Sequence, residues 1–240
     1  MLRTIGFDGD DTLWHNESLF ALSQERFYEL LRPYIDGALT AERLFAAEMR
    51  NLRLFGYGVK SFMLSMIETA IEVSEGRVTA AEIQTILDIG KGLLDHPVEL
   101  LDGVRETITA LDGRYELLLI TKGDLFHQES RIAGSGLGEF FDGIEIVSEK
   151  DPATYERILR RRGIPPESFM MVGNSVKSDV LPVIALGARA VHIPYHITWQ
   201  HEVVATDEAQ RAGYWELATI AELVPKLNEL VSEESVVGSP

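Results

Sequence analysis

Hydrophobic residues along this chain form two kinds of pattern, short continuous runs and longer stretches that repeat with a helical period. The short runs are bounded by small or polar residues, as is typical of buried strands in a parallel sheet. Helix-like stretches lie between the later runs, at residues 104–111, 155–161 and 180–186. Strands that alternate with helices predict an α/β domain with a parallel sheet. The predicted strands cover residues 4–7, 115–120, 143–147, 169–172 and 188–193.

Residues 16–99 depart from this alternation, because they contain helical repeats but no strand-like run between turns. A segment of this length is too long for an ordinary crossover between neighbouring strands. We therefore predict an all-helical domain at 16–99, inserted into an α/β core made of 1–15 and 100–240. At the other end of the chain, residues 232–240 are predicted to form a loose tail. Within the insertion, helices are predicted over residues 19 to about 33, from an N-cap at Thr40, and over 62–73 and 79–94.

Composition and charge narrow the possible functions. With 240 residues, 45% of them hydrophobic, the chain can bury a sizeable core. Its 22 basic and 38 acidic residues give a net charge of −16. This charge argues against nucleic acid and an anionic membrane as partners, although a locally positive site can still bind an anionic substrate. The lack of cysteine excludes disulfides, thiolate metal sites and cysteine nucleophiles.

The sequence predicts a soluble, cytoplasmic protein. The N-terminal segment becomes acidic at Asp8, which is too early for the apolar stretch of a signal peptide. No run of about 18 apolar residues occurs, so a membrane-spanning helix is not expected.

Three carboxylates follow the first predicted strand, in the segment Phe7-Asp8-Gly9-Asp10-Asp11-Thr12. The carboxyl ends of parallel strands are where open α/β sheets bind ligands. Asp8 and Asp10, two residues apart, can both offer oxygen to a hard cation such as Mg²⁺. The alternative is a solvated turn whose aspartates cap the next helix.

Candidate phosphate-binding groups follow the second and third strands. Thr121 and Lys122 come before Gly123, and a hydroxyl in such a turn can present its Oγ and nearby N–H groups to phosphate oxygens. Lys150 opens the segment after the third strand, where its charge could neutralise a transferring phosphoryl group. Taken singly, Thr121 is more simply interpreted as a helix N-cap and Lys150 as a solvated side chain.

Two further oxygen donors follow the fourth strand. Asn174 comes directly after Gly173, and Asp179 lies about one helical turn further on, so both side chains can face the same crevice. Both can bind a cation. The alternative is a turn followed by an aspartate that interacts with a helix dipole.

The order of these residues resembles the haloacid dehalogenase-like (HAD) superfamily, whose motifs are Asp-x-Asp-x-Thr, Ser/Thr, Lys and Gly-Asp-x-x-x-x-Asp. The matching residues are Asp8, Asp10, Thr12, Thr121, Lys150, Gly173, Asn174 and Asp179. The resemblance extends over nearly the whole chain and implies a Rossmann-like doubly wound parallel sheet with an inserted helical cap. One position departs from the pattern, because Asn174 stands where the superfamily has an aspartate.

The resemblance also implies a mechanism. Asp8 would attack the phosphorus of a small phosphorylated metabolite, and Asp10 would act as the general acid and base. Thr121 and Lys150 would hold the phosphoryl oxygens. Mg²⁺ would be bound by Asp8, the backbone carbonyl of Asp10 and a further contact from Asn174 or Asp179. Because dehalogenases of this superfamily lack an acidic residue at the position of Asp10, a phosphatase is favoured over a dehalogenase.

Several alternatives stay open in the sequence. A phosphomutase would use the same residues, and a HAD-like fold can also serve as a non-catalytic binding module. The chain could be a monomer or a homodimer. Tyr57 and Lys60, in a glycine-flanked turn of the insertion, could contact substrate or simply join two helices. Residues that could form a second metal site, or a loop packed on the sheet edge, cluster after the fifth strand: His196, Trp199, His201 and Glu202.

Overall fold

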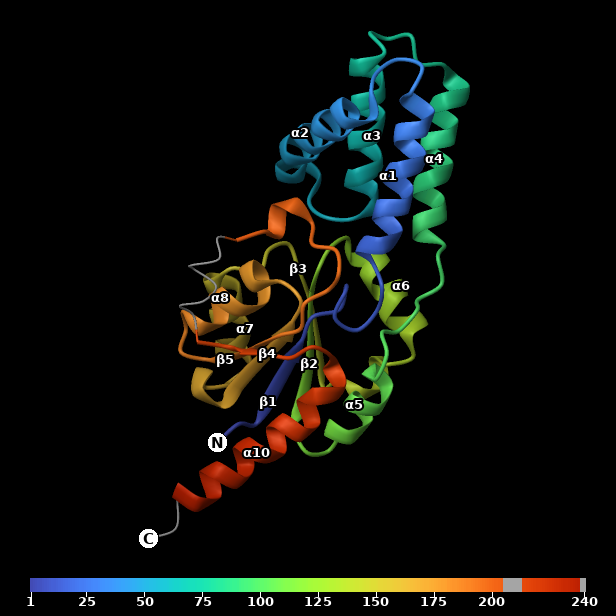
Figure 1. The fold of residues 1–240 in the computed structure, drawn as a ribbon. Helices are drawn as coiled ribbons and strands as arrows, with labels where there is room; N and C mark the ends of the chain where they lie inside the picture. The colour runs from blue at the N-terminus through green and yellow to red at the C-terminus, as the bar shows by residue number, and fades with distance from the viewer. Residues whose placement is uncertain (205–212, 238–240) are drawn as a thin grey trace. The chain divides into compact units, whose positions relative to one another are not determined.

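The computed structural model describes residues 1–204 and 213–237 (Figure 1). The chain divides into two compact units. The first consists of residues 1–15, 98–122 and 132 onward, and the second of residues 16–97 and 123–131. Among the described residues, none of the helices is both long enough and apolar enough to span a membrane.

The first unit is built on a six-stranded parallel sheet with the strand order β3-β2-β1-β4-β5-β6, which confirms the predicted α/β, doubly wound fold. The chain order reverses at β1, because its two neighbours are β2 and β4. This is the switch point at which open parallel sheets bind ligands, beyond the carboxyl ends of the strands. The strands are β1 (Thr4–Phe7), β2 (Glu116–Lys122), β3 (Gly143–Val147), β4 (Phe169–Gly173), β5 (Arg189–His192) and β6 (Trp215–Glu216).

Helices cover both faces of this sheet (Figure 1). Side chains alternate along β2, so that Leu117 and Leu119 enter one core cluster while Leu118 and Ile120 enter another. The first cluster includes residues of α5 (Val104–Leu111) and α10 (Leu223–Val237), and the second includes residues of α7 (Pro152–Arg162) and α8 (Leu181–Ile184). Burying each of these leucines contributes roughly 2–3 kcal/mol, and burial on both faces explains why the strands are continuously apolar.

The predicted loose tail at 232–240 is wrong for residues 232–237, which continue α10. The reason is that Leu223 and Leu227 are fully buried at helical spacing. Pro225 lies in the first turn, where the helix tolerates proline, and neither glycine nor proline occurs between Pro225 and Gly238. Residues 238–240 lie outside the described part of the chain. The helix predicted at 180–186 is also shorter than expected. A π-helical turn, η3 (Val176–Val180), precedes α8, and the helix stops at Ile184.

The second unit contains four helices around their own core. These are α1 (Glu17–Leu31), α2 (Gly37–Phe55), α3 (Val59–Val73) and α4 (Ala80–Leu94). Their apolar faces meet in a cluster that includes Phe27, Leu44, Met66 and Ile86. The first seven residues of α6 (Leu125–Ser135) also belong to this unit. That these helices select the substrate, as a cap would, stays a prediction.

Helix α2 does not begin where the sequence analysis placed it. Asp36, not Thr40, is its N-cap, and the Asp36 carboxylate accepts a hydrogen bond from the backbone N–H of Ala38. Thr40 instead lies inside the first turn and donates its hydroxyl to the Asp36 carbonyl oxygen. Both residue types are good caps, so the sequence alone did not separate them. The start predicted for α4 agrees with a capping box formed by Thr79 and Glu82.

Candidate active site

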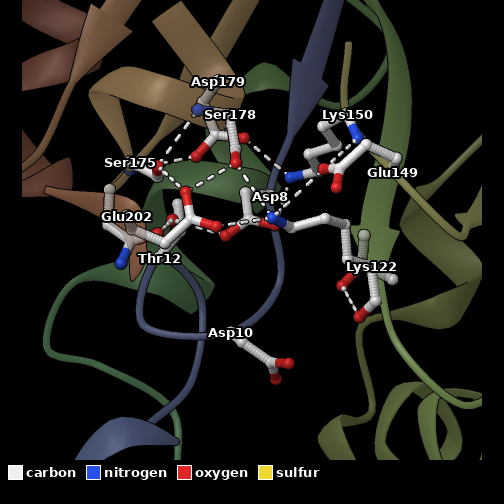
Figure 2. Close-up of polar contacts among 12 residues, drawn as sticks. Asp8, Asp10, Thr12, Lys122, Glu149, Lys150, Ser175, Ser178, Asp179 and Glu202 are labelled. Atoms are coloured by element: carbon white, nitrogen blue, oxygen red, sulfur yellow. Dashed lines mark hydrogen bonds and ion pairs between the residues drawn. The ribbon is translucent and has the colours of Figure 1, made fainter. Parts of the chain in front are cut away.

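The polar residues predicted at the strand ends meet at the carboxyl edge of the sheet (Figure 2). Asp8 follows β1, and Thr121 is the penultimate residue of β2. Lys150 follows β3 and Asn174 follows β4. Because β1 lies between β2 and β4, Asp8 is at the centre of this group.

A tight turn after β1 fixes the position of Asp8. The backbone N–H groups of Thr12, Leu13 and Trp14 all point to the carbonyl oxygen of Gly9. A side chain at Gly9 would collide with the buried ring of Trp14, since a Cβ there would lie 2.7 Å from Cζ2. The turn therefore requires glycine, and it packs against a tryptophan with no exposed surface.

Lys150 joins two buried carboxylates. Its Nζ lies 2.5 Å from Asp8 Oδ1 and 2.7 Å from Asp179 Oδ1. The Lys150 side chain is only 1% exposed, and that of Asp8 is 10% exposed. A buried ammonium needs such partners, because the desolvation of an unpaired charge is costly.

Burial and the neighbouring charges shift the proton affinities of this group. Burial raises the pKa of Asp8 to about 7, with a further increase from Asp179, while Lys150 acts in the opposite direction. Burial alone would lower the pKa of Lys150, but attraction by Asp179 and Asp8 raises it above the usual value. Lys150 therefore stays protonated at neutral pH. Positive charges beside Asp8, such as the Lys150 ammonium, favour its ionised form.

Asp179 holds Lys150 and the loop after β4 at the same time. Its Oδ2 accepts a hydrogen bond of 3.0 Å from the backbone N–H of Ser175, while Oδ1 is bonded to Lys150. A Cβ at Gly173 would collide with the Asp179 carboxylate, so glycine is needed there for this close approach. With partners on both oxygens, Asp179 is arranged to orient Lys150.

Asn174 lies beside Asp8. The hydroxyl of Thr12 is 3.2 Å from Asp8 Oδ2 and 3.3 Å from Asn174 Oδ1, so one group contacts both oxygens. The turn that carries Asp8 is thereby connected to the loop after β4. Asn174 is one of the predicted metal-binding residues, and its side-chain oxygen shares the Thr12 hydroxyl with the Asp8 carboxylate.

The Asp10 side chain is turned away from Asp8 (Figure 2). Its Oδ1 accepts a hydrogen bond of 2.7 Å from the indole Nε1 of Trp14. Asp10 is half-buried. In the described conformation, this candidate acid and base is therefore directed elsewhere.

Thr121 and Lys122 are neighbours in the chain, but their side chains have different surroundings. Thr121 is buried at the end of β2, as expected for a residue that faces the crevice. The Lys122 ammonium donates to Ser178 Oγ at 2.9 Å and to Glu202 Oε1 at 2.6 Å, and it lies 3.6 Å from Glu149. The Lys122 side chain is engaged by these residues of the protein, and its role in substrate binding stays a prediction.

Glu202, predicted only as part of a cluster after the fifth strand, contacts residues at the end of β2 and in the segment after β4. Its Oε2 accepts hydrogen bonds from Ser175 Oγ at 2.5 Å and from Ser178 Oγ at 2.6 Å, in addition to the contact with Lys122. Burial alone would raise its pKa, but Lys122 and the two hydroxyls lower the pKa of Glu202 to about 2. The signal that could have revealed this residue is Lys122 itself, a charge at the end of a buried strand that requires a partner.

The other members of that cluster do not form a second metal site. Lys177 contacts the ring Nε2 of His201 at 3.3 Å and its carbonyl oxygen at 2.7 Å, and the ring of His201 packs on Trp199. The ring of His196 packs on Tyr195. Throughout residues 1–204 and 213–237, no three His, Asp or Glu side chains are grouped as metal ligands. The alternative of a packed loop is the better description.

Lys60 and Tyr57 belong to the second unit. The Lys60 ammonium lies 3.0 Å from both carboxylate oxygens of Asp124 and 5.8 Å from the centre of the Phe126 ring. Tyr57 is half-buried in the turn between α2 and α3. A role for these two residues in substrate binding stays a prediction.

Comparisons with known proteins agree on one family. A model described as haloacid dehalogenase-like hydrolase matches residues 2–187. A crystal structure of a haloacid dehalogenase-like hydrolase from Xanthomonas campestris is similar to this chain with a TM-score of 0.85 and 43% identity. That match covers 97% of this chain and 93% of the other.

Two curated proteins are each 24% identical to this chain. One is a glyceraldehyde 3-phosphate phosphatase from Methanothermobacter thermautotrophicus, aligned over 206 residues that cover 82% of this chain and 88% of that protein. The other is a pyrimidine 5′-nucleotidase from Escherichia coli, aligned over 213 residues that cover 84% of this chain and 90% of that protein.

Proposed function

This chain is an enzyme of the haloacid dehalogenase-like hydrolase family, and we propose that it is a Mg²⁺-dependent phosphatase acting on small phosphate monoesters. The observation that carries the proposal is the placement of the Lys150 ammonium between Asp8 and Asp179. A fixed buried cation beside a carboxylate nucleophile is suited to stabilising the charge on a transferring phosphoryl group. Both curated relatives are named for the removal of phosphate from small metabolites.

In the first half-reaction, an Asp8 oxygen forms a bond to phosphorus while the bond between phosphorus and the ester oxygen breaks. Asp10 gives its proton to the departing oxygen. In the second half-reaction a water oxygen attacks phosphorus, the bond to Asp8 breaks, and the water proton passes to Asp10. Splitting the hydrolysis into two steps is the general advantage of a covalent intermediate. Thr121 and Lys150 would bind the phosphoryl oxygens throughout.

Asp10 needs a side-chain rotation to perform these transfers. Its carboxylate now accepts the indole N–H of Trp14, so the acid has to leave that hydrogen bond to reach the ester oxygen. A hydrogen bond to a charged group contributes about 1.5–3 kcal/mol, and such a rotation is therefore accessible.

The donor set near Asp8 fits Mg²⁺. The Asp8 carboxylate and the Asn174 amide offer oxygen on either side of the Thr12 hydroxyl, and the backbone carbonyl of Asp10 belongs to the same turn. Mg²⁺ prefers hard oxygen ligands and keeps several waters, so one carboxylate with two neutral oxygens is sufficient. When bound, the ion would supply positive charge to the phosphoryl oxygens. Asp179 is the weaker candidate ligand, because Lys150 and Ser175 occupy its oxygens.

The direct test is the release of inorganic phosphate from 4-nitrophenyl phosphate by purified protein, with Mg²⁺ and with excess chelator. We expect turnover that depends on Mg²⁺ and is lost in Asp8→Asn. The exposed Asp112→Asn variant removes the same charge away from the site and is the matched control. Conversion of a sugar phosphate into an isomer without phosphate release would indicate a phosphomutase and would overturn the proposal.

A further inference from the structure

The buried carboxylate of Glu202 has no part in the reaction proposed above. It lies in the short 3₁₀ helix η4 (Gln200–Glu202), after β5, and its side chain is only 12% exposed. All of its described hydrogen-bond donors come from the other segments that surround the site, namely Lys122, Ser175 and Ser178. A carboxylate bound by an ammonium and two hydroxyls is held firmly in place, because hydrogen bonds to charged groups are stronger than those between neutral groups.

The donors to Glu202 come from the ends of two different strands. Lys122 ends β2, whereas Ser175 and Ser178 follow β4, and β1 with Asp8 lies between those two strands. The Lys122 ammonium also reaches Ser178 Oγ directly, at 2.9 Å (Figure 2). Four residues, here called the Glu202 network, therefore connect the end of β2 with the segment after β4, on either side of Asp8: Lys122, Ser175, Ser178 and Glu202.

The Glu202 network continues into the catalytic group. The backbone N–H of Ser175 binds Asp179, and Asp179 holds the Lys150 ammonium against Asp8. On the other side, Lys122 is covalently next to Thr121. The Glu202 carboxylate is thus linked to both groups that would hold the phosphoryl oxygens. It is linked to Thr121 through Lys122, and to Lys150 through Ser175 and Asp179.

We propose that Glu202 is a positioning residue, which keeps the end of β2 and the segment after β4 at the separation that a phosphoryl group needs. The inference rests on the proposed phosphatase function. Glu202 would touch neither substrate nor metal ion. Its effect would pass through Lys122 to Thr121, and through Ser175 to Asp179 and Lys150.

A purely electrostatic role for Glu202 predicts the opposite result from a positioning role. Neutralising an acidic residue near a phosphate site makes the site more positive, so phosphate should then bind more tightly. If Glu202 has a positioning role, its neutralisation removes the charged partner of Lys122. The contact between the end of β2 and the segment after β4 is then weakened. Phosphate should then bind more weakly and turnover should fall.

The test compares Glu202→Gln and Glu202→Asp with the wild type and with Glu167→Gln. Glu167 is exposed and lies before the amino end of β4, away from the site, so it is a matched loss of charge. The readouts are kcat and KM for 4-nitrophenyl phosphate and the inhibition constant for inorganic phosphate. For Glu202→Gln we expect a kcat at least tenfold lower and an inhibition constant at least threefold higher. Glu202→Asp, which keeps the charge, should recover part of both, and Glu167→Gln should match the wild type.

Equal or tighter phosphate binding by Glu202→Gln, together with a kcat within twofold of wild type, would overturn the inference. Thermal unfolding of each variant shows whether it is folded. If Glu202→Gln is not folded, the same kinetic comparison is made with Glu202→Asp. Failure of the wild type to hydrolyse the ester would contradict the phosphatase proposal instead. In that case calorimetric phosphate binding and hydrogen exchange over residues 173–181 still test Glu202, since the inference requires weaker binding and faster exchange in Glu202→Gln.

Discussion

Asp179 accepts a hydrogen bond of 2.7 Å from Lys150, and both side chains are 1% exposed. The same Lys150 ammonium contacts Asp8, so Asp179 fixes the direction from which a positive charge approaches the candidate nucleophile. Asp8 directly follows β1, whereas Asp179 contacts Lys150 from η3, after β4.

We expect Asp179→Asn to lower kcat about 10²-fold or more, because a misplaced Lys150 loses much of its effect on the transition state. Breaking a buried ion pair costs about 3–5 kcal/mol, and the loss of stability should be at the low end of that range since Asp8 still pairs with Lys150. The half-saturating Mg²⁺ concentration should change little. Steady-state kinetics titrated with Mg²⁺ and chemical denaturation provide these values. A large rise in the Mg²⁺ requirement would show that Asp179 is a metal ligand.

We expect Asn174→Asp to tighten Mg²⁺ binding, because a carboxylate attracts a dication more strongly than an amide oxygen does. Asn174→Ala should weaken it. Mg²⁺ titrations of activity, supported by calorimetry on the Asp8→Asn background as a low-affinity reference, measure both changes. If the three proteins have the same half-saturating Mg²⁺, Asn174 does not bind the ion.

Asp10→Asn should slow both half-reactions, by about 10²–10⁴-fold for an alkyl phosphate, since general acid–base catalysis is typically worth that much. With 4-nitrophenyl phosphate the departing oxygen needs little protonation, so only the second step should be strongly affected. Rapid mixing should then show a burst of one 4-nitrophenol per active site, followed by slow turnover. A steady linear rate equal to the wild-type rate would exclude proton transfer by Asp10.

The lowered pKa of Glu202, about 2 in the folded protein, predicts how its contribution to stability depends on pH. An unfolded glutamate titrates near pH 4.3, so the charged form is favoured in the folded state. The stabilisation is fully present above about pH 4.3 and is lost as the pH falls toward 2. We expect the wild type to exceed Glu202→Gln by on the order of 1–3 kcal/mol at pH 7, and by much less near pH 2.5. Urea denaturation at both pH values measures the difference, and a gap that does not shrink in acid would contradict the assignment.

Much of the fold could be predicted because the central strands are buried on both faces. The runs in β1 and β4 and the run 117–120 within β2 are almost wholly apolar, and the candidate site residues lie at or just after the ends of these strands. By contrast, β6 has two residues, Trp215 and Glu216, and leaves no recognisable period in the sequence. The start of α2 was missed because Asp36 and Thr40 are both good caps.

The site was predictable where neighbouring residues in the sequence act together, and not where distant ones do. The turn from Asp8 to Thr12 is local, so its carboxylates were found directly. The pairing of Lys122 with Glu202 joins positions 80 residues apart, and no periodic pattern encodes it. The direction of the Asp10 side chain likewise depends on the buried Trp14 ring, which only the packed core orients.

The central claim is that Asp8 carries the phosphoryl group, and trapping that intermediate tests it most directly. Asp10→Asn is mixed with 4-nitrophenyl phosphate, quenched in acid within the burst and digested for mass spectrometry. We predict one phosphoryl group per protein on the peptide that contains Asp8, the same amount in the control that combines Asp10→Asn with Asp112→Asn, and none in the variant that combines Asp10→Asn with Asp8→Asn. Phosphate release at the wild-type rate by Asp8→Asn, or a phosphoryl group found on another residue, would contradict the account.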